Sequence, residues 1–565
     1  MWIKLLLLFF VFSFLFKTDS SFDQDLGRHI KLGEIITQTH TVPKTNLFSY
    51  TSPDFPFINT HWLFEVLMYG ANQTIGLQAV LILKIIIFLS SVWLVIKIVP
   101  KEKTALLLPI GFIFLHVLRE RTELRPEIFS FLFTVCTYYI LELSLRPRTR
   151  SGGSNLLFLL PIIQLIWINT HIYFFVGLIL QMIFLIHLSL KRIGAKLDHL
   201  EGGLRWHLLL ICLLLSISVS FLNPNGIAGI LYPLNVTKNY GYTIVENQTM
   251  FLLESINFHD PNFLFVKLSG GLIILSLVVA FATRKFELKN ILLASTGLGL
   301  ALLNVRSFPY LVLISLPAVL SNFPILKFKG FIKAITFIII PILILESFFY
   351  LNGDYYRFND QPVKAGLEFK ESGKQALDFL ITKDLPQPIF NNFDIGSYII
   401  YKAYPKYRVF VDGRPEAYPQ EFFLQTYIPV QSDYAKFKEL NRQVGFKTVI
   451  FSHTDQTPWG RNFLQNVVKD EDWNTVYIDD FIIILVKKGV ALGQNLTTLN
   501  LDKLNPKKYD FKNHTAYLRL GYFLLATNNV ESGVKFITQS LMIFPQSPLG
   551  NAILGNRGSN NFFGF

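Results

Sequence analysis

The feature that most constrains this chain is a series of long apolar stretches separated by short polar ones. Each is roughly 15 to 20 residues long, the length that an α-helix needs to cross the hydrocarbon core of a bilayer. They lie at residues 2–16, 78–98, 104–118, 127–145, 155–171, 172–190, 207–222, 263–283, 290–305, 308–324 and 332–350. The pattern predicts a polytopic α-helical membrane protein with about eleven transmembrane helices.

The charges of the chain are few and unevenly placed. Only 16% of the residues are charged and 51% are hydrophobic, whereas soluble domains carry about 25% charged residues. The net charge of +13 comes from Lys and Arg in short loops between apolar stretches, and no base-reading motif accompanies it. Membrane orientation explains this charge better than nucleic-acid binding does. The two cysteines, Cys136 and Cys212, lie within apolar stretches and predict no disulfide framework and no cysteine metal site.

The basic loops also predict an orientation. With the N-terminus in the cytoplasm, loops 97–103, 146–150, 191–205, 284–289 and 327–333 would face the cytoplasm, and all five are basic. A multi-pass protein of the cell membrane with an extracytoplasmic C-terminal region is expected. Residues 2–16 are interpreted as a retained first helix, and a cleaved signal peptide is the alternative.

Three regions follow from this pattern. Residues 1–350 are predicted to form the transmembrane domain, with residues 17–77 as its first outer loop. Residues 351–490 have mixed charge and alternating strand and helix signals, which favour a small α/β domain outside the membrane. Its expected strands are Arg408–Val411, Thr448–Phe451 and Phe481–Val486, and its expected helices are Lys374–Leu380 and Tyr434–Val444.

Residues 491–565 are predicted to be a polar linker and a helical hairpin. Leu520, Gly533, Phe536 and Pro545 fit the spacing of a tetratricopeptide repeat. Because one repeat cannot bury its apolar face alone, it should pack on the preceding domain or bind a protein partner.

Polar residues gather in the loops assigned to the outer face. Ionisable groups at helix ends are costly unless they are paired or functional, so their joint placement predicts a polar cavity that opens outward. The candidate substrate-binding residues in these loops are His29, His61, Glu65, Arg119, Arg121, Arg125, Asn169, His171, Asn223 and Arg306. The same face carries Glu120, Glu123, Glu127, Asn225 and Glu254.

These residue types suit a lipid-linked phosphosugar. Arginine forks fit phosphate oxygens, and Asp23 or Asp25 in the first loop could act as a general base or hold a divalent cation such as Mg²⁺ or Mn²⁺. Structural alternatives remain open for several residues. The arginines could be interfacial anchors, His61 could belong to an aromatic belt with Trp62, and His171 could be a satisfied helix-end histidine.

A second motif lies in the α/β region, where Val411-Asp412-Gly413-Arg414 follows an expected strand. Asp-Gly after a strand is typical of a turn. Contact of Asp412 and Arg414 with substrate is one interpretation, and a buried structural Asp–Arg pair is the other.

Together these motifs resemble those of the GT-C glycosyltransferases, including the RgtA/B/C/D-like and protein-mannosyltransferase-like groups. The resemblance covers roughly residues 1–490. It rests on Asp23 and Asp25, Trp62-Leu63-x-Glu65, Arg125-Pro126-Glu127, Asn169-x-His171, Asn223-Pro224-x-Gly226, Asp394-x-Gly396-x-Tyr398 and the Asp412–Arg414 turn.

The resemblance implies a polyprenyl-phosphate sugar donor, an inverting transfer on the outer face and a catalytic aspartate in the first outer loop. Carried over, that aspartate is Asp25 or Asp23, and Asp25 is favoured because it begins the pattern that reaches His29 and Gly33. A non-enzymatic scaffold or a transporter is the competing interpretation. A transporter should show internal repeats or broken helices, and the sequence shows no repeat between its halves.

Overall fold

The computed structural model describes residues 1–144, 154–194, 200–235, 240–256, 258, 260–284, 287–324, 329–489 and 496–555. The chain forms two compact units. The helical unit comprises Met1–Phe16, Ile58–Lys238 and Thr243–Leu351, and the mixed unit comprises Lys17–Phe57, Asn239–Tyr242 and Asn352–Phe565.

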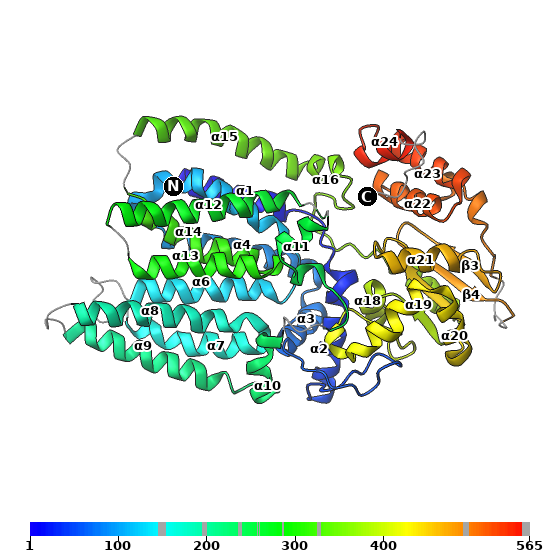
Figure 1. Ribbon diagram of the computed structural model, residues 1–565, viewed down its shortest axis with the longest axis horizontal. Coiled ribbons are helices and arrows are strands. Elements are labelled where there is room, and N and C mark those ends of the chain that lie inside the picture. Colours follow the sequence, from blue (N-terminus) through cyan, green and yellow to red (C-terminus); the bar gives the residue numbers. More distant parts are fainter. Residues whose placement is uncertain are drawn as a thin grey trace. The chain divides into compact units, whose positions relative to one another are not determined.

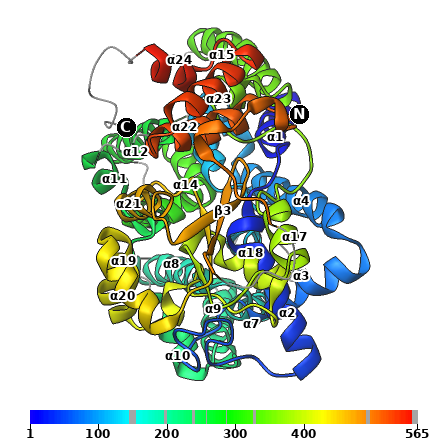
Figure 2. The same cartoon turned by 90° about the vertical axis from the view of Figure 1, so that its right-hand side faces the viewer.

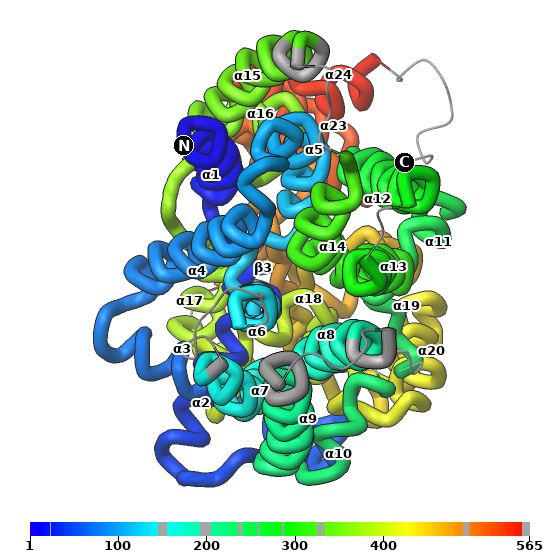
Figure 3. The backbone as a smooth tube through the Cα atoms, turned by 90° about the vertical axis from the view of Figure 1, so that its left-hand side faces the viewer, coloured from blue at the N-terminus to red at the C-terminus, as the bar shows by residue number. Residues whose placement is uncertain are grey.

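All eleven apolar stretches of the sequence are helical. They form α1 (Trp2–Leu15), α4 (Leu77–Ile98), α5 (Thr104–His116), α6 (Glu127–Ser144), α7 (Leu159–Thr170), α8 (Phe175–Gly194), α9 (Leu200–Val219), α12 (Pro261–Ala282), α13 (Leu288–Leu303), α14 (Phe308–Asn322) and α15 (Lys329–Leu351). Figure 1 shows the long helices of this unit running side by side, and Figure 3 shows them end-on. Helix α14 contacts α4, α5, α6, α12 and α13 and is the most buried of the long helices, whereas α15 is the least buried.

Fewer helices meet the length and composition of a membrane span than the eleven apolar stretches predict. Among the described residues, six helices are long and apolar enough to cross a membrane, and several others are apolar but shorter. The protein is therefore a polytopic helical membrane protein, while the count of eleven spans and the orientation of the termini stay predictions.

Short elements connect the long helices. They include α3 (Trp62–Thr74), α10 (Gly226–Leu231), α11 (Met250–Ser255), η2 (Lys101–Lys103), η3 (Val117–Glu120), η4 (Ser154–Phe158), η5 (Ile172–Phe174), η6 (Tyr232–Asn235), η7 (Val245–Asn247) and η8 (Val305–Ser307). Most of the polar residues of the candidate site lie in or beside these connections.

The mixed unit is built on a four-stranded sheet. Its strands β1 (Ile389–Asn391), β2 (Thr448–Ser452), β3 (Trp473–Ile478) and β4 (Ile482–Lys487) lie in the order β1-β2-β4-β3, with β1 parallel to β2 and the other pairs antiparallel. Its helices are α2 (Gly27–Thr39), α16 (Asp354–Phe358), α17 (Lys374–Thr382), α18 (Phe393–Ala403), α19 (Ile428–Ser432), α20 (Tyr434–Val444) and α21 (Pro458–Val467), and its short helices include η1 (Phe22–Leu26) and η10 (Phe422–Tyr427). Figure 2 looks toward this sheet and its flanking helices. The expected α/β architecture is confirmed, with β2, β4, α17 and α20 at the predicted places.

The predicted strand Arg408–Val411 is wrong. This segment forms no strand ladder, and its hydrogen bonds go to a side chain and to the first loop. Phe410 N donates to Asn391 Oδ1 at 2.8 Å, and Asn391 Nδ2 donates to Val411 O at 2.7 Å. Val409 N donates to Phe48 O at 3.0 Å, so one isolated bridge to the first loop replaces a regular strand partner.

The first loop folds with the mixed unit. Helices η1 and α2 pack on α18, and the Phe22 ring lies 5.9 Å from Tyr398 and 5.0 Å from Tyr401. A Cβ at Gly27 would lie 2.9 Å from Tyr401 Cβ, so a glycine permits this close packing. The sequence-based grouping of residues 17–77 with the transmembrane region therefore differs from the observed division for residues 17–57.

The C-terminal helices α22 (His514–Ala526), α23 (Val530–Ile543) and α24 (Pro548–Gly555) follow the sheet. The hairpin of α22 and α23 is present, but its assignment as a tetratricopeptide repeat is not confirmed. Leu520, Phe523 and Phe536 share one hydrophobic core with strand residues such as Phe451 and Ile483. The hairpin thus packs on the preceding domain, and a protein partner stays a prediction.

A buried histidine in this core generates a prediction about pH. His453 Nε2 lies 2.9 Å from Asp479 O and the ring lies 4.7 Å from Phe523; burial lowers the pKa of His453 to about 4. At pH values between the lowered pKa of about 4 and the ordinary histidine pKa of about 6.5, the unfolded chain binds a proton that the folded chain does not. We therefore expect His453 to cost about 2 kcal/mol of stability at pH 5 relative to pH 7 or above.

The measurement is thermal unfolding of the purified full-length protein in detergent at pH 7 and pH 5. His453→Gln, which keeps a donor for Asp479 O, should show a smaller loss of melting temperature between the two pH values than the unmodified protein. Equal losses in the two proteins would contradict the assignment.

Candidate functional site

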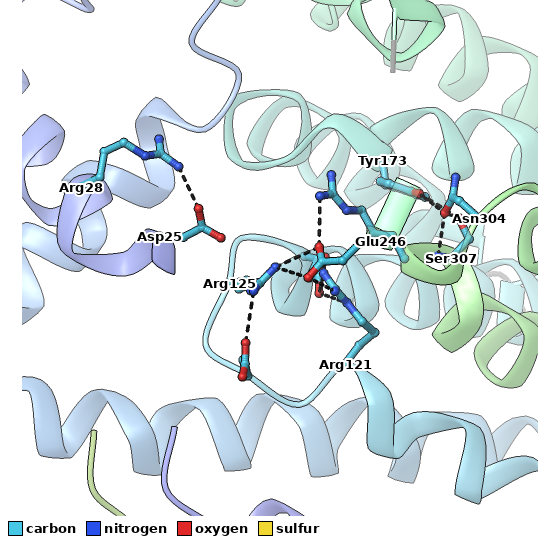
Figure 4. Close-up of polar contacts among 11 residues, drawn as sticks. Asp25, Arg28, Arg121, Arg125, Tyr173, Glu246, Asn304 and Ser307 are labelled. Carbon is cyan, nitrogen blue, oxygen red and sulfur yellow. Dashed lines mark hydrogen bonds and ion pairs between the residues drawn. The ribbon is translucent and has the colours of Figure 1, made fainter. Parts of the chain in front are cut away.

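Three arginines of the helical unit converge on one carboxylate. We call Arg121, Arg125, Arg306, Glu123, Glu127 and Glu246 the arginine cluster; Figure 4 shows its contacts. Arg121 Nη1 lies 2.7 Å from Glu246 Oε1, Arg125 Nη1 donates to Glu246 Oε1 at 2.8 Å, and Arg306 Nη2 donates to Glu246 Oε2 at 3.2 Å. Arg121 and Arg125 come from the connection between α5 and α6, and Arg306 comes from the connection between α13 and α14, so arginines of two loops meet at Glu246.

The Arg121–Glu127 pair forms the buried part of the cluster. Arg121 Nε and Nη2 donate to the two oxygens of Glu127 at 2.7 and 2.8 Å, which is the bidentate geometry that guanidinium favours. Their side chains are 6% and 7% exposed. Burial alone would lower the pKa of Arg121, but Glu127 and Glu246 outweigh it and raise the pKa, so the guanidinium stays charged.

Glu246 is a partly accessible acid of this cluster, as is Glu123, whose side chain is 25% exposed. The Glu246 side chain is 26% exposed, and it comes from η7, a connection separate from those that carry the arginines. Burial would raise the pKa of Glu246, but Arg125, Arg121 and Arg306 together hold it well below its ordinary value. The carboxylate is therefore ionised at any working pH.

Arg119 lies in a different group of the same unit. Its Nη1 donates to Tyr350 OH at 2.6 Å and lies 3.7 Å from Glu346 Oε1, while its guanidinium carbon lies 5.2 Å from the centre of the Phe265 ring. His116 Nε2 also contacts Glu346, at 3.0 Å. These contacts join η3 and α5 to α15, which favours an anchoring role for Arg119.

A second polar group of this unit contains the predicted residues Asn169, His171 and His61. Trp62 Nε1 donates to Asn169 Oδ1 at 2.7 Å, and His171 Nδ1 lies 2.7 Å from Ser130 Oγ. The His61 and His171 rings lie 5.5 Å apart. The Trp62-Leu63-x-Glu65 and Asn169-x-His171 motifs are thus neighbours.

Glu65 and Asn223 are held by local hydrogen bonds. Glu65 is 1% exposed and accepts from Asn59 Nδ2 at 2.6 Å. Asn223 Oδ1 accepts from Asn225 N, and its Nδ2 donates to Ser220 O and Gly226 O, which closes the Asn-Pro-x-Gly turn. Gly226 there has φ +53°, a conformation that glycine adopts without strain. A small cavity is lined by residues of this region, among them Asn59, Trp62, Asn223 and Asn225.

Asp25 lies in the mixed unit, in η1. Its Oδ1 pairs with Arg28 Nη2 at 3.2 Å, and its side chain is 26% exposed (Figure 4). A Cβ at Gly413 would lie 3.8 Å from Asp25 Oδ1, so the aspartate is beside the Asp412–Arg414 turn. His29 is 5% exposed in α2. The side chain of Asp23 lies outside the described residues.

Asp412 and Arg414 are sealed inside the mixed unit. They are 0% and 1% exposed and form a bidentate pair at 2.7 and 2.8 Å. Tyr418 OH donates to Asp412, and Arg414 donates to Asn46 Oδ1. This geometry favours the structural alternative for the pair.

The Asp394-x-Gly396-x-Tyr398 motif has a packing explanation. A Cβ at Gly396 would lie 2.2 Å from Val411 O and 2.6 Å from Asp412 Cα, so α18 approaches the turn as only glycine allows. Tyr398 OH donates to Glu371 Oε2 at 2.7 Å. The motif thus places α18 between the first loop and the Asp412–Arg414 turn.

A metal site is not evident in the described part of the chain. No group of three or more His, Cys, Asp or Glu side chains there is arranged to hold a metal ion. A divalent cation at the first loop stays a prediction.

The sequence reasoning passed over several residues of the two polar groups. Glu246 is the principal one, and its signal was an acid within a long outer connection. Ser130 and Trp167 left no signal, because a serine and a tryptophan inside an apolar helix look like ordinary packing residues. Their hydrogen bond, Trp167 Nε1 to Ser130 Oγ at 2.6 Å, depends on helix neighbours that a single sequence does not show.

No family model and no curated protein sequence matches the chain. The structure is similar to the archaeal oligosaccharyltransferase AglB of Archaeoglobus fulgidus in complex with an inhibitory peptide and a dolichol-phosphate. The TM-score is 0.51 at 11% identity, and the match covers 97% of this chain and 86% of that one.

Two further structures are similar. The A. fulgidus oligosaccharyltransferase tethered to an acceptor peptide with an NVT sequon gives a TM-score of 0.50 at 11% identity, covering 96% of this chain and 86% of that one. ArnT of Cupriavidus metallidurans bound to undecaprenyl phosphate gives 0.45 at 10% identity, covering 87% of this chain and 98% of that one.

The fold is that of the GT-C membrane glycosyltransferases. The resemblance seen in the sequence motifs is thereby confirmed at the level of the fold. At these identities the likeness extends to the fold alone.

The buried pair of the arginine cluster yields a stability prediction. Replacing one partner of a buried ion pair costs about 3–5 kcal/mol, because the other charge is left without compensation. Glu127→Gln should therefore lower the melting temperature of the purified protein clearly. Glu123→Gln is the matched control, since Glu123 is 25% exposed and contacts Arg125 at 3.2 Å. A larger effect from Glu123→Gln than from Glu127→Gln would contradict this ranking.

Proposed function

We propose that this protein is an integral-membrane glycosyltransferase that transfers a sugar from a polyprenyl-phosphate donor to an acceptor on the extracytoplasmic face. The observation that carries the proposal is the convergence of three guanidinium groups on one anion within a GT-C fold. This arrangement can bind a phosphate group beside membrane-embedded helices.

The chemistry of the cluster suits phosphate. Guanidinium groups give charge-assisted hydrogen bonds to phosphate oxygens and, unlike lysine, do so with a planar fork of donors. Arg125 and Arg306 are fixed by carboxylates that leave part of the cluster accessible to solvent, with Arg306 22% exposed. In the proposal, Arg121, Arg125 and Arg306 bind the donor phosphate and stabilise the negative charge that builds up on it during transfer.

The reaction also needs a base for the acceptor. Asp25 is the proposed base, since its carboxylate is partly exposed and is oriented by Arg28. It takes the proton of the acceptor hydroxyl, the oxygen of that hydroxyl attacks the anomeric carbon, and the bond from this carbon to the phosphate oxygen breaks. The lipid phosphate leaves with the electron pair, and the sugar is transferred with inversion.

The fold likeness supports the donor class. AglB, which shares the fold of this chain, binds a dolichol-phosphate.

The test is the transfer of labelled sugar from polyprenyl-phosphate donors by membranes that contain the protein. Asp25→Asn should lower the rate by about 10²- to 10⁴-fold, the usual contribution of a general base. Asp54→Asn is the matched control, because Asp54 is an exposed aspartate of the same loop with φ +62°, which asparagine also tolerates.

Full activity of Asp25→Asn would rule out its role as the base. Absence of transfer by the unmodified protein with every donor, together with absence of lipid-phosphate binding, would favour the scaffold or transporter interpretation.

A further inference from the structure

Glu246 is the one carboxylate that all three arginines of the cluster share. Its two oxygens accept from Arg121, Arg125 and Arg306 at distances of 2.7 to 3.2 Å. Three guanidinium groups present more N–H donors than the two oxygens of one carboxylate can accept. The buried Nε of Arg306 finds no acceptor among the described residues. The donor set is larger than this acid requires.

The other two acids of the cluster are bound differently. Glu127 begins α6 and is fixed to Arg121 by two hydrogen bonds, and Glu123 lies in the same connection as Arg125. Glu246 comes from η7, a turn of three residues that lies against η8. The Val305 N to Gln248 O hydrogen bond, at 3.0 Å, holds the main chain after η7 in place.

The Glu246 side chain can leave without moving that main chain. A quarter of its surface faces solvent, whereas the Arg121 and Glu127 side chains are almost fully buried. Rotation about its side-chain bonds takes the carboxylate out of the cluster, and the arginines keep their positions because Glu127 and Glu123 still bind two of them. The cluster is therefore preformed around an exchangeable anion.

The charge balance of the cluster determines which anion can replace Glu246. Among the described residues, the three arginines and three glutamates of the cluster sum to zero charge, so departure of Glu246 leaves one positive charge there. A phosphodiester, the linkage of a lipid-phosphate sugar, brings one negative charge and restores neutrality. A diphosphate carries more negative charge than the single positive charge that the cluster then has.

We propose that Glu246 occupies the phosphate place of the site in the absence of donor and exchanges with a single phosphodiester group. This inference rests on the proposed function and deepens it, because it names a monophosphate-linked donor over a diphosphate-linked one. Glu246 then acts as an internal competitor: it keeps the arginines paired when no donor is bound, and its return helps to expel the lipid phosphate that transfer releases.

The experiment measures binding of two lipid probes to the full-length protein in detergent. The probes are the methyl phosphodiester of a C20 polyprenol, with one negative charge, and the C20 polyprenyl diphosphate. The unmodified protein should prefer the phosphodiester. Glu246→Gln removes the competing charge and should bind the phosphodiester about tenfold more tightly, equivalent to about 1.4 kcal/mol.

Two variants serve as controls. Glu254→Gln removes an acid of the next helix, α11, which pairs with Lys267 outside the cluster, and should change the affinity less than twofold. Arg306→Gln should weaken phosphodiester binding at least tenfold, because Arg306 has no other acid partner among the described residues. Inorganic phosphate as a third probe separates recognition of the phosphate group from recognition of the lipid.

The outcomes distinguish failure of the Glu246 exchange from failure of the proposed function. If the unmodified protein binds the phosphodiester and Arg306→Gln weakens it, but Glu246→Gln binds equally or less tightly, Glu246 orients the arginines and the exchange is wrong while the proposed function stands. If the unmodified protein binds neither lipid, the proposed function fails. Should Glu246→Gln not fold, Glu246→Asp, which withdraws the carboxylate by one methylene, should give a smaller gain in affinity.

Discussion

Pairing of buried charges is the constraint on which the polar end of the helical unit depends. Arg121, Arg125 and Glu127 are all at most 10% exposed, and an ionised group in that environment is tolerated only with an opposite charge at hydrogen-bond distance. The connections that carry Arg121, Glu246 and Arg306 have little regular main-chain pairing of their own. Their ion pairs therefore determine how the loops between α5 and α6, before α11, and between α13 and α14 meet.

Burial separates the roles of two arginine–carboxylate groups, the Asp412–Arg414 pair and the arginine cluster. In the mixed unit, Asp412 and Arg414 are fully enclosed, and Tyr418, Asn46 and the Phe48 and Phe57 rings surround them. Burial would raise the pKa of Asp412, but Arg414 holds it below its ordinary value, so the pair is ionised and satisfied. A ligand could reach it only by unfolding the turn. The arginine cluster has a partly exposed acid and surplus donors, and this difference makes it the better candidate for a binding site.

The sequence predicted where the helices and strands lie better than it predicted which residues they contact. Apolar length alone located the eleven apolar helices among the described residues of the helical unit, because a stretch of such length has few other stable arrangements. It could not tell how many of them cross a membrane, since α5 and α7 are shorter than a full span. Arg408–Val411 has the composition of a strand, but Asn391 and Phe48 take the hydrogen bonds that a strand neighbour would have made. These partners lie far away in the chain, where local pattern carries no information.

The same limit applies to the site. Arginines at the ends of apolar stretches were visible, and they predicted that some would meet. The sequence could not separate Arg119, which joins η3 to α15, from Arg121, two residues later, which enters the cluster. Nor could it single out Glu246, since its importance comes from three arginines at other places in the chain.

The electrostatics of the cluster also bear on turnover. A lipid-phosphate donor carries one negative charge, and the lipid phosphate that remains after transfer is a monoester whose charge approaches two at neutral pH. Without Glu246 the cluster would keep one net positive charge, because Glu127 and Glu123 still pair with two of its arginines, and this charge would slow the release of the anionic product. A tethered carboxylate with a pKa held well below neutral remains an anion throughout the cycle and is present at high local concentration. An acid placed this way lowers the affinity for the donor somewhat, but it also limits inhibition by the product. For a site built from arginines, product inhibition is the greater of these two costs.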